Sequence, residues 1–200
     1  MWRSEPKANF TESLSTMSSS YLFQSARLGF RVWNAKDLPA FAEMNAHSEV
    51  MQHFPAPLSK SESKKSMEKQ ISDFNKNGFC YFAVDELASG KLIGMIGMSN
   101  KDFPSSFTPA IDIGWRLSNK FWGKGYAAEG ALRCLSFAFE ELNLKHIVSI
   151  APLVNENSIR VMQKIGMHKL LEFKHPQLTE HKNLVNCVCY EIKSNTRSLS

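Results

Sequence analysis

The stretch "FWGKGYAAEGA", Phe121 to Ala131, decides the fold: it places two glycines around a lysine and continues into an alanine-rich, helix-like segment. Glycines such as Gly123 and Gly125 let the main chain approach a ligand closely. A helix that begins near Tyr126 presents its positive end to the same place, and this end favours anions. The stretch therefore predicts a loop that binds a phosphate-bearing cofactor.

Two common phosphate-binding designs fit this loop poorly. A nucleoside triphosphate loop needs Lys and then Ser or Thr after its last glycine, but a tyrosine follows Gly125. The dinucleotide pattern GxGxxG/A is met by Gly123, Gly125 and Ala128. That pattern requires a strand directly before it, and here residues 118–122 intervene. An NAD-binding oxidoreductase therefore stays open only as the weaker alternative.

The composition is that of a globular chain. With 200 residues, 43% of them hydrophobic and 22% charged, the chain suits one domain with a sizeable core. It contains no apolar run of the roughly 18 residues that a membrane span needs, and no apolar signal core near its start. We therefore expect a cytoplasmic protein with no membrane partner.

The net charge of +5 leaves nucleic acid and anionic small molecules open as partners. The lysines between residues 60 and 76 are interleaved with acidic residues, which is typical of a solvated helix face. We expect no direct contact with nucleic acid. Both a monomer and a homodimer remain open.

Cysteine and histidine spacing argues against a metal site. The four cysteines form no CxxC pair, and the six histidines form no HExxH motif. We therefore expect reduced, buried thiols and no metal. These four cysteines are Cys80, Cys134, Cys187 and Cys189.

Hydrophobic periodicity predicts seven strands and four helical segments in the order β-α-α-β-β-β-α-β-α-β-β. Residues 1–20 are polar and predict a mobile tail, and residues 21–195 predict a single domain. The expected strands are residues 26–33, 79–87, 91–99, 110–117, 146–154, 168–173 and 184–192. The expected helical segments are residues 34–54, 59–78, 125–142 and 155–166.

"NKFWGKGYAAEGA" resembles the acyl-CoA pyrophosphate loop of the GNAT family of N-acetyltransferases, whose pattern is [QR]xxGx[GA]. Gly123 and Gly125 match the pattern, while Lys120 replaces Gln or Arg and keeps a cation. The resemblance extends over roughly residues 23–192, through "IGWRL", "NENSIRVMQKIGM" and "FKHPQL". It is greatest to the branch that contains the ribosomal-protein N-terminal acetyltransferases, the RimJ/RimL-like enzymes.

This resemblance implies an α/β (α+β) fold with one mixed, mostly antiparallel seven-stranded sheet and helices on both faces. It also implies that the fourth and fifth strands, residues 110–117 and 146–154, splay apart so that pantetheine lies between them. An unpaired strand inside a protein is costly, so pairing with the ligand explains its presence. The implied contacts to acetyl-CoA are Trp115, Arg116, Leu117, Ser118, Phe121, Trp122, Gly123, Lys124, Gly125, Tyr126, Ala127, Ala128, Asn155, Ser158, Arg160 and Lys164.

The resemblance further implies direct transfer of acetyl from acetyl-CoA to a primary amine in a ternary complex. "NENS" resembles the family's NxxS element, which makes Asn155 a cofactor contact and Ser158 the general acid; both residues could instead serve only to cap a helix. Asp112 and His175 are the candidates for the general base.

The acceptor amine is left open by the sequence. Protein N-termini, lysines, polyamines and aminoglycosides are all primary amines. An α-amino group, with a pKa of about 7.7–8.0, needs less help than lysine to become neutral. The branch resemblance favours a protein or peptide N-terminus. A non-catalytic acyl-CoA-binding module is the main alternative to an enzyme.

Overall fold

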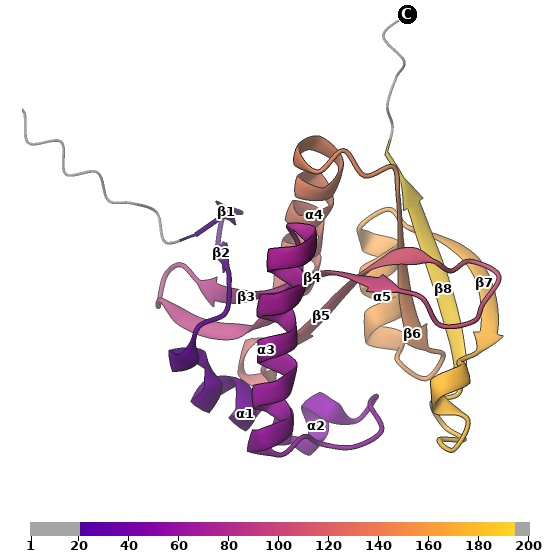
Figure 1. Ribbon diagram of the computed structural model, residues 1–200, viewed down its shortest axis with the longest axis horizontal. Coiled ribbons are helices and arrows are strands. Elements are labelled where there is room, and N and C mark those ends of the chain that lie inside the picture. The colour runs from indigo at the N-terminus through magenta and orange to yellow at the C-terminus, as the bar shows by residue number, and fades with distance from the viewer. Residues whose placement is uncertain (1–20, 195–200) are drawn as a thin grey trace, which may run out of the picture.

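One eight-stranded sheet organises residues 21–194, the residues that the computed structural model describes (Figure 1). The strand order across the sheet is β1-β2-β3-β4-β5-β6-β8-β7. Neighbouring strands are antiparallel except β5 and β6, which are parallel. The strands are β1 (Phe23–Gln24), β2 (Leu28–Arg31), β3 (Tyr81–Glu86), β4 (Lys91–Lys101), β5 (Ala110–Leu117), β6 (His146–Pro152), β7 (His168–Lys174) and β8 (Asn186–Lys193).

The expected mostly antiparallel sheet is confirmed, but the expected count of seven strands is wrong within residues 21–194. The additional strand is β1, which pairs Phe23 with Phe30 of β2. A turn separates the two strands, with the Ser25 main-chain N–H donating to the carbonyl of Leu28 at 2.9 Å. A two-residue strand is too short to produce alternation, which is why periodicity missed it. The tail predicted for residues 1–20 lies outside the described residues.

The helices form largely where capping signals predict them. In α3, the Ser59 hydroxyl accepts from the Glu62 main-chain N–H, and Gly78 ends the helix at a φ of 76°. The single segment expected at 34–54 is instead a 3-10 turn and two helices, because His47 adopts an extended conformation. The helices are α1 (Leu38–Ala46), α2 (Ser48–Met51), α3 (Lys60–Asn77), α4 (Tyr126–Ser136) and α5 (Glu156–Lys164).

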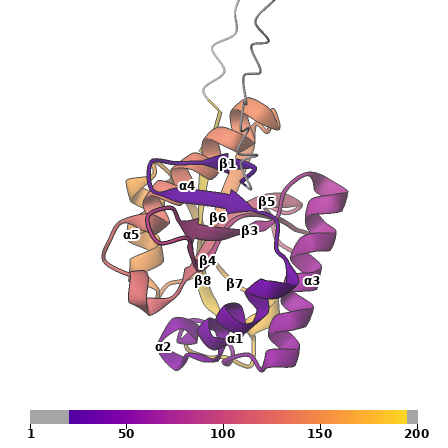
Figure 2. The ribbon, with the colours of Figure 1, turned by 90° about the vertical axis from the view of Figure 1, so that its left-hand side faces the viewer.

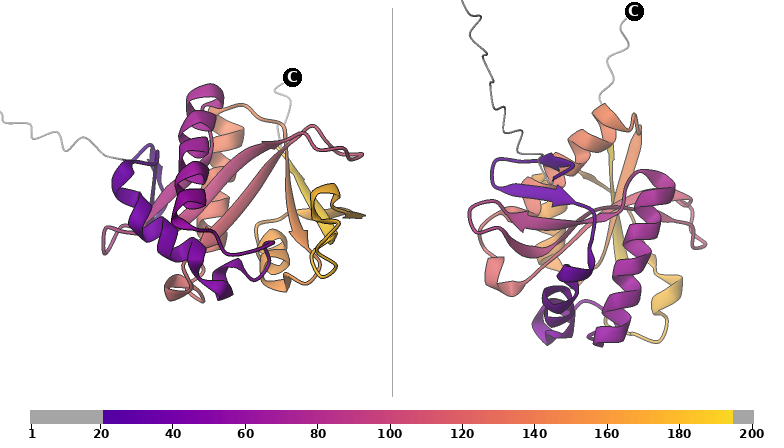
Figure 3. Two further views of the ribbon diagram at one scale, coloured as in Figure 1. Left: turned by 60° about the horizontal axis from the view of Figure 1, so that its bottom comes forward. Right: turned by 60° about the vertical axis from the view of Figure 1, so that its left-hand side comes forward.

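Helices cover both faces of the sheet, as expected. Helices α1 to α3 pack on one face, where Phe41 and Met67 meet Met95 of β4. Helices α4 and α5 pack on the other, where Leu135 and Met162 join Ile96 of β4. Figure 2 shows α3 on the opposite side of the strands from α4 and α5, and Figure 3 shows the same layers from two further directions. No helix in residues 21–194 is long and apolar enough to cross a membrane.

The sheet opens between β5 and β6. Within the described part of the chain, their ladder consists of one pair, Asp112 with Val148. By contrast, β4 and β5 pair continuously from Lys101–Ala110 to Gly94–Leu117. The splay expected between these two strands is therefore confirmed, and it leaves one edge of the second half of β5 without a neighbouring strand.

Candidate active site

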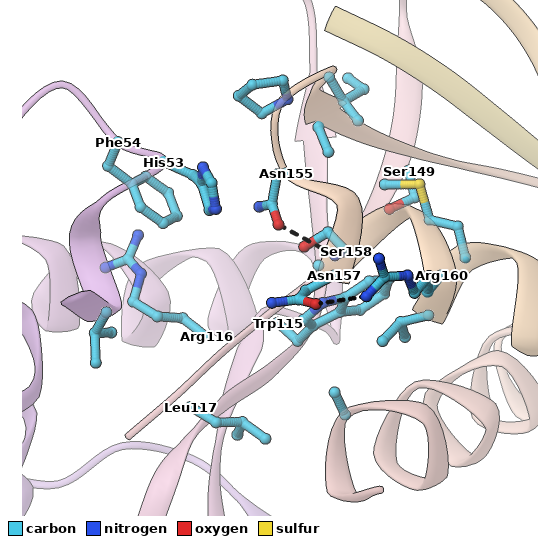
Figure 4. A pocket seen from close by; sticks show the side chains of 18 of the residues that line it. His53, Phe54, Trp115, Arg116, Leu117, Ser149, Asn155, Asn157, Ser158 and Arg160 are labelled. Carbon is cyan, nitrogen blue, oxygen red and sulfur yellow. Dashed lines mark hydrogen bonds between the residues drawn. The ribbon is translucent and has the colours of Figure 1, made fainter. Parts of the chain in front are cut away.

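A pocket of about 710 Å³ occupies this opening in the sheet. Its walls come from β5, β6, the loop before α4, the first turns of α4 and α5, and the segments around residues 49–55 and 175–178. Of the residues predicted from the sequence, Asp112, Trp115, Arg116, Leu117, Phe121, Trp122, Gly123, Gly125, Tyr126, Ala127, Ala128, Asn155, Ser158, Arg160, Lys164 and His175 line it. Figure 4 shows side chains from these elements around the same space.

The main chain of β5 presents alternate residues to this opening. The N–H of Ser118 donates to the carbonyl of Ile93 at 2.9 Å, so its main chain faces β4. Because main-chain direction alternates along a strand, Trp115 and Leu117 face the opening. Consistent with this, the Leu117 carbonyl accepts a 2.9 Å hydrogen bond from the Trp122 indole. Two of the four predicted main-chain contacts thus point toward the pocket, while Arg116 and Ser118 point toward β4.

The glycine loop lies at one end of the pocket and leads directly into α4. Gly123 and Gly125 have φ angles of 74° and 79°, which side-chain-bearing residues rarely adopt. Gly125 is the N-cap residue of α4, and no atom lies within 4 Å of the position that a Cβ on Gly123 would take. The loop therefore exposes main chain beside the N-terminus of an eleven-residue helix, an arrangement suited to a phosphate.

The lysines of the loop do not line the pocket. The Lys120 ammonium lies 2.8 Å from Glu43, and the Lys124 ammonium lies 3.7 Å from Glu86. Lys124 also lies over the ring of Tyr126, at 5.8 Å from its centroid. The donors that the loop itself offers to the pocket are therefore main-chain groups.

Asn155 and Ser158 lie together at the start of α5. The Asn155 side-chain oxygen accepts from the main-chain N–H of Ser158 at 3.1 Å (Figure 4). The cap uses the Ser158 main chain and leaves its hydroxyl free for another role. Arg160, one turn on, forms a 2.6 Å ion pair with Glu156 and is mostly exposed. Capping and pocket lining are thus combined in the same residues.

Asp112 is 5% exposed and sits where β5 and β6 separate. One carboxylate oxygen accepts from the Ile150 N–H of β6 at 3.2 Å, and the other accepts from the Tyr81 hydroxyl at 2.5 Å. The Lys101 ammonium lies 3.9 Å away. Burial raises the pKa of Asp112 above its usual value, although Lys101, Tyr81 and Ile150 oppose the shift. A carboxylate with a raised pKa is a better proton acceptor.

His175 lines the pocket beyond Asp112. Its ring centroid lies 4.5 Å from that of Phe103, and its Nδ1 accepts from the Gln177 main-chain N–H at 3.2 Å. Burial, and then the charge of Lys101, lowers the pKa of His175. The imidazole is therefore neutral near pH 7. Because Nδ1 accepts from Gln177, the proton of the neutral ring lies on Nε2, so His175 can act as a base only after it gives up this hydrogen bond or changes tautomer.

Tyr81 is a pocket residue that the sequence interpretation missed. In the sheet it pairs with Gly97 of β4, which in turn pairs with Gly114 of β5. A Cβ on Gly114 would lie 3.2 Å from the Tyr81 ring. The ring therefore lies over β5 at Gly114, where the missing side chain leaves room for it, while Gly97 lets the main chains of β3 and β4 approach closely. Glycine in the middle of a strand was the available signal.

Thiols and metal ligands do not contribute a second site. All four cysteines are free and buried, and burial raises the pKa of Cys80 to about 12 and that of Cys187 to about 11. Such thiols are poor nucleophiles at neutral pH. Residues 21–194 contain no group of three or more His, Cys, Asp or Glu side chains placed to hold a metal ion.

Known proteins resemble this chain in sequence and in structure. A model of the acetyltransferase (GNAT) domain matches residues 27–168. The uncharacterised N-acetyltransferase YnaD of Bacillus subtilis (strain 168) is 33% identical over 148 residues, which are 74% of this chain and 83% of YnaD. A GNAT-family acetyltransferase from Bacillus anthracis superposes with a TM-score of 0.72 at 26% identity, over 85% of this chain and 96% of that one.

A third likeness concerns the fold alone. The ribosomal L7/L12 alpha-N-protein acetyltransferase RimL, solved in complex with coenzyme A, superposes with a TM-score of 0.69 at 15% identity. The superposition covers 84% of this chain and 95% of RimL. The RimJ/RimL resemblance read from the sequence is thus present at the level of structure.

Proposed function

Because this chain belongs to the GNAT family of acetyltransferases and is an N-acetyltransferase, we propose that it moves acetyl from acetyl-CoA directly to a primary amine while both substrates are bound. The observation that carries this proposal is the opening between β5 and β6, with the glycine loop and the N-terminus of α4 at one end. It offers an extended strand edge for an amide-containing arm and main-chain donors for a diphosphate.

In this proposal the pantetheine arm pairs with β5 in place of a strand. Trp115 and Leu117 supply the main-chain groups, while Gly123, Gly125 and the first turn of α4 hold the diphosphate. The thioester then lies near Asp112, where the two strands come together again. Asn155 and Ser158 line the β6 side of the same space.

The chemistry needs two proton movements. The amine nitrogen attacks the thioester carbonyl, a C–N bond forms, and Asp112 takes a proton from that nitrogen directly or through water. The C–S bond then breaks, and the Ser158 hydroxyl donates a proton to the departing thiolate, whose pKa is close to the 8.5 of a cysteine thiol. The proton on Asp112 returns through solvent and restores Ser158. His175 is the second candidate for the base.

We propose a protein or peptide N-terminus as the acceptor. Support comes from the fold shared with RimL, a ribosomal-protein α-N-acetyltransferase. It also comes from the site chemistry, since an α-amino group is partly neutral at pH 7 and needs only a modest base. Asp112 with its raised pKa is such a base.

The proposal is tested by binding and turnover measured together. Thermal unfolding is followed with acetyl-CoA, CoA and NADH in parallel, and release of free CoA is followed with a panel of primary amines that includes ribosomal-protein peptides. Stabilisation by acetyl-CoA and CoA at concentrations well above Kd, with CoA release in the presence of an amine, supports the proposal. Stabilisation without CoA release identifies a non-catalytic acyl-CoA-binding module. Stabilisation by NADH alone contradicts the proposal.

A further inference from the structure

The side chain of Arg116 lines the pocket on the face of β5 that is turned toward α1. Side chains alternate along a strand, so Arg116 projects to the same face of β5 as Gly114 and Asp112, away from the packed side of α4. This face meets the segment that follows α2, and Figure 4 shows the Arg116 side chain beside Phe54 and His53. We take this side of the pocket, between the segment after α2 and β5, as the place where the acceptor binds and call it the acceptor end.

The Arg116 guanidinium is held in place without being neutralised. One of its terminal nitrogens donates to the Asn45 side-chain oxygen at 2.8 Å, and its carbon lies 4.1 Å from the centroid of the Phe54 ring. Its Nε is shielded from solvent and has no hydrogen-bond acceptor among the residues of the described chain. Within residues 21–194, no ion pair joins Arg116 to an aspartate or glutamate. Burial lowers its pKa to about 10.

Arg31 is a structural arginine of the same chain, and its charge is neutralised by carboxylates. Its guanidinium binds Asp37 through two bonds of 2.7 and 2.8 Å, and binds Asp85 at 2.7 and 2.9 Å. The carboxylates raise its pKa. Two carboxylates therefore stabilise the charge of Arg31, whereas no carboxylate of residues 21–194 forms an ion pair with Arg116. A buried charge without a counter-ion is costly, so an unneutralised arginine facing a ligand pocket is a feature that a ligand explains.

The other charged groups at this end do not supply the missing anion. Glu49 is exposed, accepts a 2.8 Å hydrogen bond from the neutral Asn119 amide and forms no ion pair with Arg116 within residues 21–194. Asp112 is engaged by Tyr81 and lies 3.9 Å from Lys101. Burial lowers the pKa of His53, which therefore adds no negative charge and little positive charge near pH 7. Arg116 therefore has no carboxylate partner within residues 21–194, and its positive charge matches a carboxylate of the acceptor but not an ammonium.

The support beneath Arg116 is rigid. Asn45 is fully buried, and its amide nitrogen donates to the equally buried Ser63 hydroxyl at 3.2 Å. Its main-chain carbonyl also accepts from the Leu58 N–H at 2.9 Å. Asn45 thus ties α1, α3 and the intervening loop to the guanidinium, which leaves its remaining donors in a fixed direction. Fixed donors bind a planar carboxylate better than mobile ones.

We propose that Arg116 binds a carboxylate on the acceptor, so that the enzyme acts on primary amines that carry an acidic group in preference to polyamines. This assignment rests on the proposed acetyltransferase function and specifies the substrate class of the same site. The carboxylate can belong to a free amino acid or to an acidic side chain of a peptide. Both offer the same pair of oxygens to the guanidinium.

The test compares acceptors that differ only in charge. One pair is a peptide with glutamate at its second position and the same peptide with glutamine; the other is 4-aminobutyrate and its amide. Spermidine is the cationic acceptor. The variants are Arg116→Gln and Arg116→Lys, and the control is Arg133→Met. Arg133 also lies over a phenyl ring, that of Phe23 at 4.7 Å, but it is outside the pocket.

We expect wild-type kcat/KM to be higher for the acidic member of at least one pair and lowest for spermidine. Arg116→Gln lowers kcat/KM for that member by roughly 10- to 100-fold and leaves its amide and the Kd for acetyl-CoA nearly unchanged. Arg116→Lys retains part of the preference, and Arg133→Met retains all of it. The pair that responds identifies whether the carboxylate belongs to a peptide or to a free amino acid.

Equal kcat/KM for acid and amide in the wild type, or an equal loss for both in Arg116→Gln, overturns the proposal. Calorimetric binding of each acceptor to the enzyme–CoA complex supplies a readout that does not need turnover. If the protein acetylates no acceptor but binds acidic acceptors selectively through Arg116, the proposed reaction is wrong and the carboxylate site stands. If the protein acetylates acidic acceptors and their amides equally well, the proposed reaction stands and the carboxylate site is wrong.

Discussion

The Tyr81 hydroxyl of β3 donates a 2.5 Å hydrogen bond to the Asp112 carboxylate of β5, across the intervening strand β4. Burial and the nearby charge of Asp112 raise the pKa of Tyr81 well above its ordinary value, so the phenol keeps its proton and remains the donor. The hydrogen bond stabilises the ionised form of Asp112. It therefore partly offsets the burial that raises the pKa of this carboxyl group.

Replacing Tyr81 with Phe removes this hydrogen bond and raises the pKa of Asp112 further, because the ionised carboxylate loses a donor. If Asp112 is the base, the acidic limb of the kcat/KM profile moves to higher pH. The measurement is kcat/KM between pH 5 and 9. Tyr190→Phe is the control, since Tyr190 lies outside the pocket and contacts Gln163. If the acidic limb of Tyr81→Phe lies at the same pH as that of the wild type, Asp112 is not the base.

Replacing Asp112 with Asn keeps an oxygen that can accept from the Ile150 N–H but removes the proton acceptor. We expect kcat to fall by roughly 10²- to 10⁴-fold with little change in the Kd for acetyl-CoA. Asp102→Asn, on the exposed loop after β4, is the control and leaves kcat unchanged. A full rate in Asp112→Asn together with a large loss in His175→Gln would assign the base to His175.

Asp112 also contributes a pH dependence to stability. Its pKa is raised in the folded state, so protonation favours folding. The contribution is fully present below the unfolded pKa of about 3.9 and is lost as pH rises through the folded pKa. We expect Asp112→Asn to remove this part of the pH dependence of the free energy of unfolding, measured in urea. If the free energy of unfolding changes with pH by the same slope in both proteins, the pKa of Asp112 is not raised in the folded state.

Replacing Ser158 with Ala deletes the hydroxyl and spares the cap, because the Asn155 side chain accepts from the Ser158 main-chain N–H. We expect a lower kcat with an unchanged melting temperature and an unchanged Kd for acetyl-CoA. Asn155→Ala is the matched variant, and it loses about 1 kcal/mol of stability through the missing cap. An unchanged kcat in Ser158→Ala excludes its hydroxyl as the general acid.

Replacing Gly123 with Ala places a Cβ on a residue whose φ is 74°. The cost in stability is about 1–2 kcal/mol, and we also expect weaker binding of CoA, because the methyl group occupies the side on which a phosphate approaches. Gly90→Ala is the control, since Gly90 has a φ of 64°, open space around its Cβ position and a place in a remote hairpin. Calorimetry that finds equal Kd values for CoA in both variants contradicts the phosphate-binding role of the loop.

The part of the site that local sequence patterns encode could be predicted. Gly123 and Gly125 need φ angles that only glycine adopts readily, so their spacing reports a main-chain conformation directly. Asn155 caps the helix that its position predicted. Seven of the eight strands were found because alternation persists over four or more residues, and β1 was missed because it has two.

The part that depends on contacts between distant residues could not be predicted. Tyr81 reaches Asp112, 31 residues away along the chain, and Arg116 reaches Asn45, 71 residues away. Neither pair leaves a periodic signal, because each partner looks like an ordinary strand or helix residue by itself. The sequence also could not predict which residues of β5 turn their main-chain N–H and C=O groups toward the opening, because this depends on which residue of β5 pairs with Ile93.

In residues 21–194, the two halves of the sheet are joined by one ladder pair, Asp112 with Val148, and by the side-chain hydrogen bonds of Ser149 and Asp112. We expect the amide hydrogens of Trp115 and Leu117, which face no other strand within residues 21–194, to exchange with solvent in the empty protein and to become protected if the arm of the cofactor pairs with them as proposed. We therefore expect the loaded protein to be stiffer at the centre of its sheet than the empty one.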